Sequence, residues 1–96
     1  MRVLLKAQMD VEKGNQAIKD GTLPQAIQSV MGDLKPEAAY FAPLDGKRTA
    51  LIFFDLQDPS DLPRVSEPFF SLANASVEVM PCMDVDDLQA GLQKIS

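Results

Sequence analysis

The chain has 96 residues, a formal net charge of −5 and no histidine. This length fits one domain, residues 1–96, whose core is small enough that a partner subunit would help to stabilise it. Apolar residues make up 46% and charged residues 24%, as in ordinary globular proteins, and the longest apolar run, residues 50–54, is too short to cross a bilayer. Because no basic cluster is present, we expect no nucleic-acid partner. The short apolar run likewise indicates no membrane partner.

The single cysteine, Cys82, can form no internal disulfide, and Lys6, Gln8 and Asp10 interrupt any signal-peptide core at the amino terminus. We therefore expect a cytoplasmic protein.

The first part of the chain is predicted to form a strand and a broken helix. Residues 2–9 alternate between two sets of side chains, which indicates a strand. Asp10 is a good residue to begin a helix, which Gly21 would stop. Residues 22–25 resemble a capping box for a second helical piece, whose apolar residues recur at helical spacing up to Leu34.

The remaining chain is predicted to continue with a hairpin, a helix, a strand and a last helix. Asp45-Gly46 separates two apolar runs, 37–43 and 47–56, and this dipeptide is a strong hairpin signal. A helix opens near residues 58–61, with Pro63 and Pro68 expected to shorten or kink it, and residues 75–82 form the fourth strand. The order βαββαβ predicts an α+β, ferredoxin-like fold with a four-stranded antiparallel sheet.

The C-terminal helix, which residues 84–87 would cap, is an addition to this fold. Its apolar stripe is expected to dock either on the edge of its own sheet or on a partner subunit, because it is too apolar to leave in water and too short to be stable alone. The residues of that stripe are Val85, Leu88, Leu92 and Ile95.

A two-residue turn at Asp45-Gly46 would pair Tyr40 with Leu51 and Ala38 with Phe53, and paired residues share a sheet face. One face is then entirely apolar and is covered by helices. The other face mixes large apolar groups with charges, and we expect two copies of the chain to pack sheet against sheet through it. The expected interface residues are Leu4, Lys6, Tyr40, Leu51, Phe53 and Met80.

The topology, the length and the half-apolar second face together resemble the dimeric α/β-barrel superfamily. Residues 53–84, FFDLQDPSDLPRVSEPFFSLANASVEVMPCMD, are similar to the strand-helix-strand half of muconolactone isomerases. The segments DGTLPQAIQSVM, KPEAAYF, RTALIFFD and EPFFSLANASVEV resemble a group of small bacterial proteins of that superfamily. The resemblance implies a sheet-to-sheet homodimer but names no reaction, because its motifs are packing motifs.

Enzymes of that superfamily include cofactor-free monooxygenases and haem-handling proteins, several of which use histidine or tryptophan. This chain has neither residue, so a histidine-ligated haem or zinc site and the usual Ser-His or Cys-His pairs are excluded. We expect no cofactor. The acidic residues 84–87 lack the glycine and the downstream glutamate of a calcium loop, and capping explains them, so we expect no metal.

Three residues are the weak catalytic candidates that remain: Tyr40, Asp55 and Glu67. Each has an ordinary alternative, which is an interface anchor for Tyr40, an ion pair with Arg2 or the N-terminal amine for Asp55, and a solvated helix surface for Glu67. Two hypotheses therefore remain open. We favour a homo-oligomeric module without enzymatic activity; the alternative is a cofactor-free isomerase or monooxygenase-like enzyme that binds a small, partly apolar aromatic or lactone-type ligand between sheet and helices.

Overall fold

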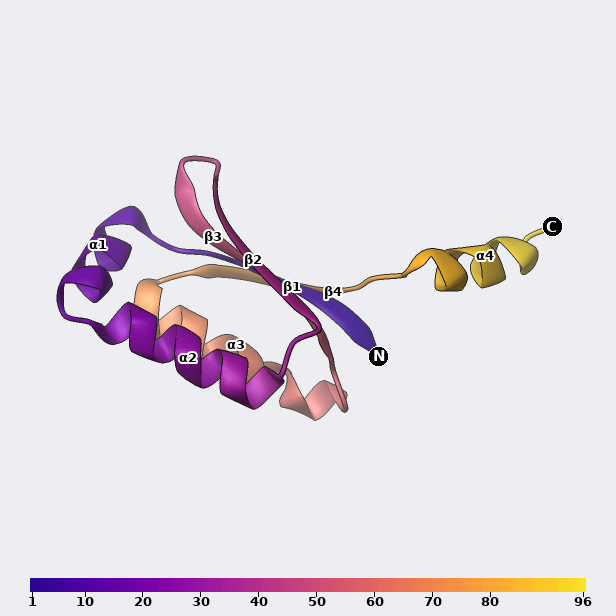
Figure 1. Cartoon of the computed structure of the whole chain (residues 1–96), viewed down its shortest axis with the longest axis horizontal. Coiled ribbons are helices and arrows are strands. Elements are labelled where there is room, and N and C mark those ends of the chain that lie inside the picture. Colours follow the sequence, from indigo (N-terminus) through magenta and orange to yellow (C-terminus); the bar gives the residue numbers. More distant parts are fainter.

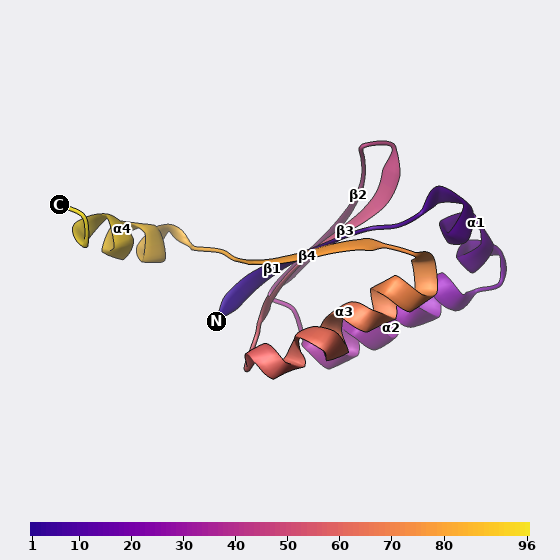
Figure 2. The ribbon, with the colours of Figure 1, turned by 180° about the vertical axis from the view of Figure 1, so that it is seen from behind.

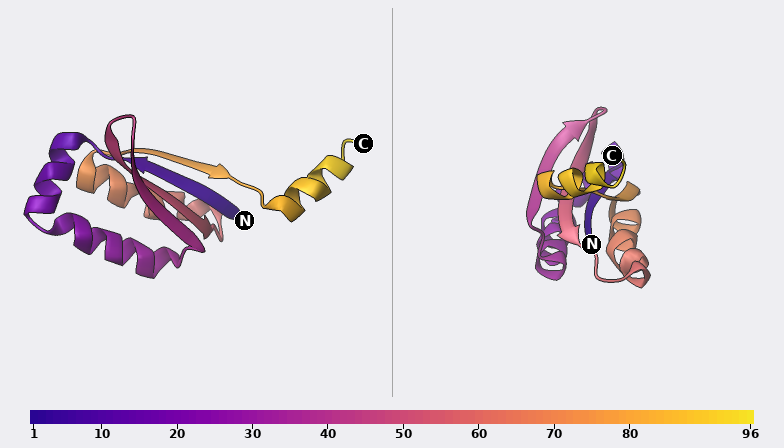
Figure 3. Two further views of the ribbon diagram at one scale, coloured as in Figure 1. Left: turned by 45° about the horizontal axis from the view of Figure 1, so that its top comes forward. Right: turned by 90° about the vertical axis from the view of Figure 1, so that its right-hand side faces the viewer.

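A computed structural model describes all residues, 1–96, and has two layers with a projecting helix (Figure 1). The strands β1 (Arg2–Gln8), β2 (Ala38–Leu44), β3 (Lys47–Asp55) and β4 (Ser76–Pro81) form one antiparallel sheet in the order β2-β3-β1-β4. The fold is therefore ferredoxin-like α+β, as the sequence predicts. Helices α2 (Thr22–Leu34) and α3 (Leu62–Ala73) lie on one side of the sheet, and α1 (Val11–Lys19) lies at the end of the sheet (Figures 2 and 3).

The hairpin between β2 and β3 has the predicted register. Asp45 and Gly46 both have positive φ, 55° and 73°, as the tight turn requires. Tyr40 accordingly pairs with Leu51 and Ala38 pairs with Phe53. Because the register is as expected, each side chain of β3 lies on the face that the alternation assigned to it.

The core lies between the sheet and the helices. Alternate residues of β1 and β3 point into it, and they meet Val65 and Phe69 of α3. Leu5 and Ile52 are the most deeply buried large side chains. Only 16 of the 96 residues are buried, so the core of this chain is small for its length.

The first helix is broken as predicted, although its second half is not capped as predicted. Asp10 caps α1 by accepting a hydrogen bond from the Lys13 amide. At the break, Gly21 has a φ of 79°, and Thr22 already lies inside α2. Asp20, and not a box formed by residues 22–25, accepts hydrogen bonds from the Thr22 amide and hydroxyl. The expected capping box is therefore wrong, because the tight turn at Gly21 starts the helix one residue earlier.

The third helix runs without interruption through its inner proline. A short 3₁₀ turn (Pro59–Asp61), capped by Asp58, leads directly into α3. Pro63 occupies the first turn, where its missing N–H is tolerated, and Pro68 lies inside the helix. The helix has 12 residues and continues past Pro68, so this proline does not end it.

The last helix, α4 (Val85–Gln93), projects away from the two layers (Figures 1 and 3). Residues 84–87 cap its start as predicted, with Asp84 and Asp87 forming a capping box. The helix has no extensive packing contact with another helix or strand, and Figure 1 shows it away from the edge of its own sheet. The four residues of its apolar stripe are exposed by 68%, 44%, 52% and 82% for Val85, Leu88, Leu92 and Ile95. Docking on a partner subunit remains the prediction for this helix.

Candidate functional site

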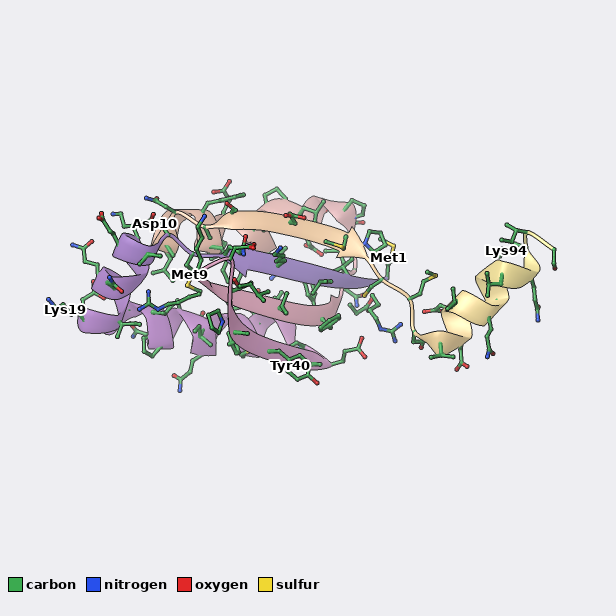
Figure 4. The ribbon with its side chains drawn as sticks, turned by 90° about the horizontal axis from the view of Figure 1, so that it is seen from above. Met1, Met9, Asp10, Lys19, Tyr40 and Lys94 are labelled. Atoms are coloured by element: carbon green, nitrogen blue, oxygen red, sulfur yellow. The ribbon has the colours of Figure 1, made fainter.

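The open face of the sheet is the face opposite helices α2 and α3, and it is turned towards the viewer in Figure 4. Three rows of neighbouring residues cross this face. The strand register defines each row from β2 to β4. The apolar row contains Ala38, Phe53, Leu4 and Met80. The mixed row contains Tyr40, Leu51, Lys6 and Glu78. The polar row contains Ala42, Thr49, Gln8 and Ser76. All six predicted interface residues lie in the first two rows.

The apolar row lies at the end of the sheet from which α4 projects. Leu4, Leu51 and Phe53 are half-buried by their neighbours within the chain, whereas Met80 is 38% and Tyr40 62% exposed. Tyr40 lies on the outer strand β2 (Figure 4). Thr49 of the polar row is only 2% exposed. The Gln8 amide of the same row donates to the Leu44 carbonyl and the Asp45 carboxylate, which brings it over the hairpin end of the sheet.

Asp55, at the end of β3, forms an ion pair with the N-terminal amine. The Met1 nitrogen lies 2.5 Å from Asp55 Oδ1, and the Gln57 amide donates to the other carboxylate oxygen. The hydrogen bond from the Met1 amino group lowers the pKa of Asp55 below its ordinary value. A lowered pKa favours the ionised carboxylate, so this residue is arranged as a structural partner and holds no proton at neutral pH.

The three catalytic candidates do not converge. Tyr40 and Asp55 lie on the open face and at its end, whereas Glu67 is exposed on α3 on the other side of the sheet. An apolar slot of about 20 Å³ lies between the helices and the sheet, beside Phe69 and Ile52. None of the three candidates lines this slot, and no carboxylate does. None of the three candidates therefore provides a polar group beside this slot.

Arg2, the first residue of β1, connects the sheet to the projecting helix α4 through ion pairs. Its Nε lies 2.5 Å from Glu37 Oε1, and its two terminal nitrogens lie 3.1 Å from Asp87 and 3.5 Å from Asp84. One guanidinium thus faces three carboxylates from the start of β2 and the first turn of α4. These ion pairs were not predicted, because Arg2 was expected beside Asp55, its neighbour in the register.

The cap of α4 leads to a prediction about acid pH. A hydrogen bond from the Asp87 amide lowers the pKa of Asp84 below its ordinary value of 3.8. Because folding lowers this pKa, the ionised cap favours the helix above pH 3.8, and its contribution disappears as the pH falls through the lower folded value. We expect circular dichroism at 222 nm to weaken in this range. The Asp84→Asn variant, which keeps a capping oxygen without a titrating group, should lose part of this change; an unaltered acid response would contradict the assignment.

Sequence reasoning missed Arg48, which lies across helix α1 at Gly14. The guanidinium donates to the Val11 carbonyl and to Asn15 Oδ1. Two signals were present in the sequence. Gly14 is a glycine within a helical segment, and Arg48 is a charged residue on the face of β3 that the helices cover.

Metal ligands provide a further prediction. No three side chains among the histidine, cysteine, aspartate and glutamate residues converge in a way that would hold an ion. We expect elemental analysis of purified protein to find no zinc, iron or haem iron in stoichiometric amount, because Cys82 is the only soft ligand in the chain. One tightly held transition metal per chain would contradict this expectation.

The comparisons with known proteins identify no family. No protein-family model matches the chain, and no curated protein matches it. No helix combines the length and the apolar character that a membrane crossing requires. The fold and the open face together define the class: a ferredoxin-like α+β protein with helices on one side of its sheet and an amphipathic face on the other.

Proposed function

We propose that this protein is a homodimeric module of the α/β-barrel type, in which two copies pack sheet against sheet through the open face. The observation that carries the proposal is the apolar row formed by Ala38, Phe53, Leu4 and Met80, together with Leu51 and Tyr40 beside it. A contiguous apolar area on one face of a small protein is typical of an interaction surface. A twofold pairing would bury the same residues on both copies.

The total surface of the chain supports association. A compact monomer of 10.5 kDa is expected to expose about 5,400 Å², whereas this chain exposes 6365 Å². The excess, roughly 950 Å², is close to the share of about 800 Å² that each partner buries in a stable interface. The radius of gyration, 15.0 Å, also exceeds the value of about 12.5 Å expected for a compact domain of this length.

The charged residues of the mixed row would set the register of the dimer. Lys6 and Glu78 face each other on neighbouring strands beside the apolar row. At a sheet-to-sheet interface an unpaired charge is costly, so only arrangements that leave these two groups paired or at the rim are favoured. Charge placement therefore selects one orientation among those that bury Phe53.

The projecting helix would belong to the same assembly. Its stripe has no partner within the chain, and the ion pairs of Arg2 with Asp84 and Asp87 hold its first turn beside the apolar end of the open face. A second copy packed on that face is therefore the nearest available surface for the stripe. We propose that α4 docks on the partner subunit. The lone cysteine is consistent with a cytoplasmic location for the dimer.

Light scattering at micromolar concentration tests the proposal directly. We expect a mass close to twice 10.5 kDa. A stable monomer at this concentration would refute the sheet-to-sheet dimer. The isomerase or monooxygenase-like alternative is less well supported, because Tyr40, Asp55 and Glu67 do not line the apolar slot between sheet and helices.

A further inference from the structure

Arg48 differs from the other two arginines of the chain in its partners. Arg2 and Arg64 both pair with carboxylates, whereas none of the ion pairs in the structure includes Arg48. Arg48 donates only to neutral acceptors: Nη1 to the Val11 carbonyl at 3.4 Å and Nη2 to Asn15 Oδ1 at 2.9 Å. A guanidinium has five N–H donors, so most of its donor capacity has no acceptor in the protein.

Gly14 provides the space that places this guanidinium. A Cβ atom built on Gly14 would lie 2.8 Å from Arg48 Nη1 and 3.5 Å from its Cδ, so any other residue would displace the side chain. Glycine is an unfavourable residue inside a helix, and α1 nevertheless has it at its centre. Arg48 is thus held across α1 by shape and by two hydrogen bonds, and it is only half-exposed.

An apolar groove of about 410 Å³ lies between β2, α2 and the end of β1. Arg48 is one of its lining residues, and its guanidinium lies at the edge towards α1. The apolar wall of the groove includes Met9, Leu23, Ile27 and Phe41, and Arg48 is its only charged residue. Phe41 is 51% exposed, so part of this wall is open to solvent. The same four apolar residues also line the narrower slot that leads to Phe69.

We propose that this groove binds a small carboxylic acid with an apolar chain or ring. The carboxylate would accept hydrogen bonds from the Arg48 guanidinium, whose planar donors match two carboxylate oxygens. The apolar body would lie along Ile27 and Phe41, displacing water from apolar surface. A single cation matches a singly charged acid better than a phosphate, which carries more charge and needs more donors. The groove lies at the hairpin end of the sheet and includes Ala42 and Thr49 of the polar row. No residue of the apolar row lines it, so the proposal does not depend on the dimer.

Titration with sodium octanoate, followed by ¹⁵N–¹H NMR of the full chain, tests the proposal. We expect saturable shifts of the amide signals of Leu23, Ile27 and Phe41 and of the Arg48 Nε–H. Octanol, with the same chain and no charge, should require about tenfold more ligand for half-saturation, because a hydrogen bond to a charged group contributes more than a neutral one. Equal half-saturation for octanoate and octanol would overturn the proposal, as would shifts scattered over the whole surface.

Two variants separate the Arg48 contact from general hydrophobic binding. Arg48→Gln should raise the octanoate half-saturation about tenfold while leaving that of octanol unchanged. Arg64→Gln, which removes an arginine paired with Asp33 outside the groove, is the matched control and should bind octanoate as the wild type does. Circular dichroism of both variants verifies that they fold. Unchanged octanoate binding by Arg48→Gln would overturn the proposal, and so would groove signals that respond to protein concentration but not to octanoate.

Discussion

Replacing Phe53 by aspartate is expected to convert the proposed dimer into a monomer or an aggregate. Phe53 lies in the apolar row between Ala38 and Leu4, and its side chain points to the open face. In a sheet-to-sheet dimer the new carboxylate would have no counter-charge, and an uncompensated buried charge costs about 3–5 kcal/mol. Such a cost weakens association by roughly 10²- to 10⁴-fold. Light scattering over a micromolar concentration series measures the change.

The fold of the monomer should survive the Phe53→Asp change. The neighbours of Phe53 along the strand, Ile52 and Phe54, fill the core from the opposite face, and they are unaltered. Ser29→Asp is the matched control, because it adds the same charge at an exposed position of α2. It should leave association unchanged. An unperturbed dimer for Phe53→Asp would require the sheet-to-sheet arrangement to be abandoned.

A mixing experiment tests whether Phe53 lies near the twofold axis. If the two copies bring their Phe53 residues together, Phe53→Asp and Phe53→Lys should each be monomeric alone, since each places like charges opposite one another. An equimolar mixture would restore a heterodimer through opposite charges. A mixture that stays monomeric would indicate that Phe53 lies away from the axis.

Substituting the apolar stripe of α4 is the second change with a large expected effect. The double variant Leu88→Asp, Leu92→Asp should weaken dimerisation and lower the midpoint of thermal unfolding, because both leucines are exposed in the single chain and would be buried only by the partner. Complete burial of one leucine contributes about 1.5–3 kcal/mol, so even partial burial of two predicts at least about a tenfold rise in the dissociation constant. Deletion of residues 84–96 should have the same direction of effect.

Gln93→Asp is the control for the stripe, since it places a carboxylate on α4 outside the apolar residues. It should leave the dissociation constant and the unfolding midpoint close to those of the wild type. If the double variant and the deletion both matched the wild type in mass and thermal midpoint, docking of α4 on the partner would be refuted. A monomer that kept its wild-type midpoint would instead show that α4 contributes to association alone.

Local sequence patterns were sufficient for the strands, the hairpin register and most helix starts. Alternation in residues 2–9 depends only on the period of a strand, and the register of β2 and β3 follows from the two-residue turn at Asp45-Gly46. The caps at Asp10 and Asp84 are likewise formed within one helical turn. Each of these features involves residues close together in the chain, so their chemistry can be recognised without the tertiary structure.

Contacts between distant segments were decided only by the tertiary structure. Arg2 could be placed beside Asp55 from the register, yet its guanidinium reaches instead to Glu37 and to the first turn of α4, because a long flexible side chain is oriented by every carboxylate within its reach. Arg48 lies across Gly14, 34 positions earlier in the sequence, only because β3 passes beside α1. The projection of α4 was equally beyond the sequence: its apolar stripe indicates that the helix needs a partner surface, but the direction of the helix depends on the three residues after β4 and on the ion pairs of Arg2.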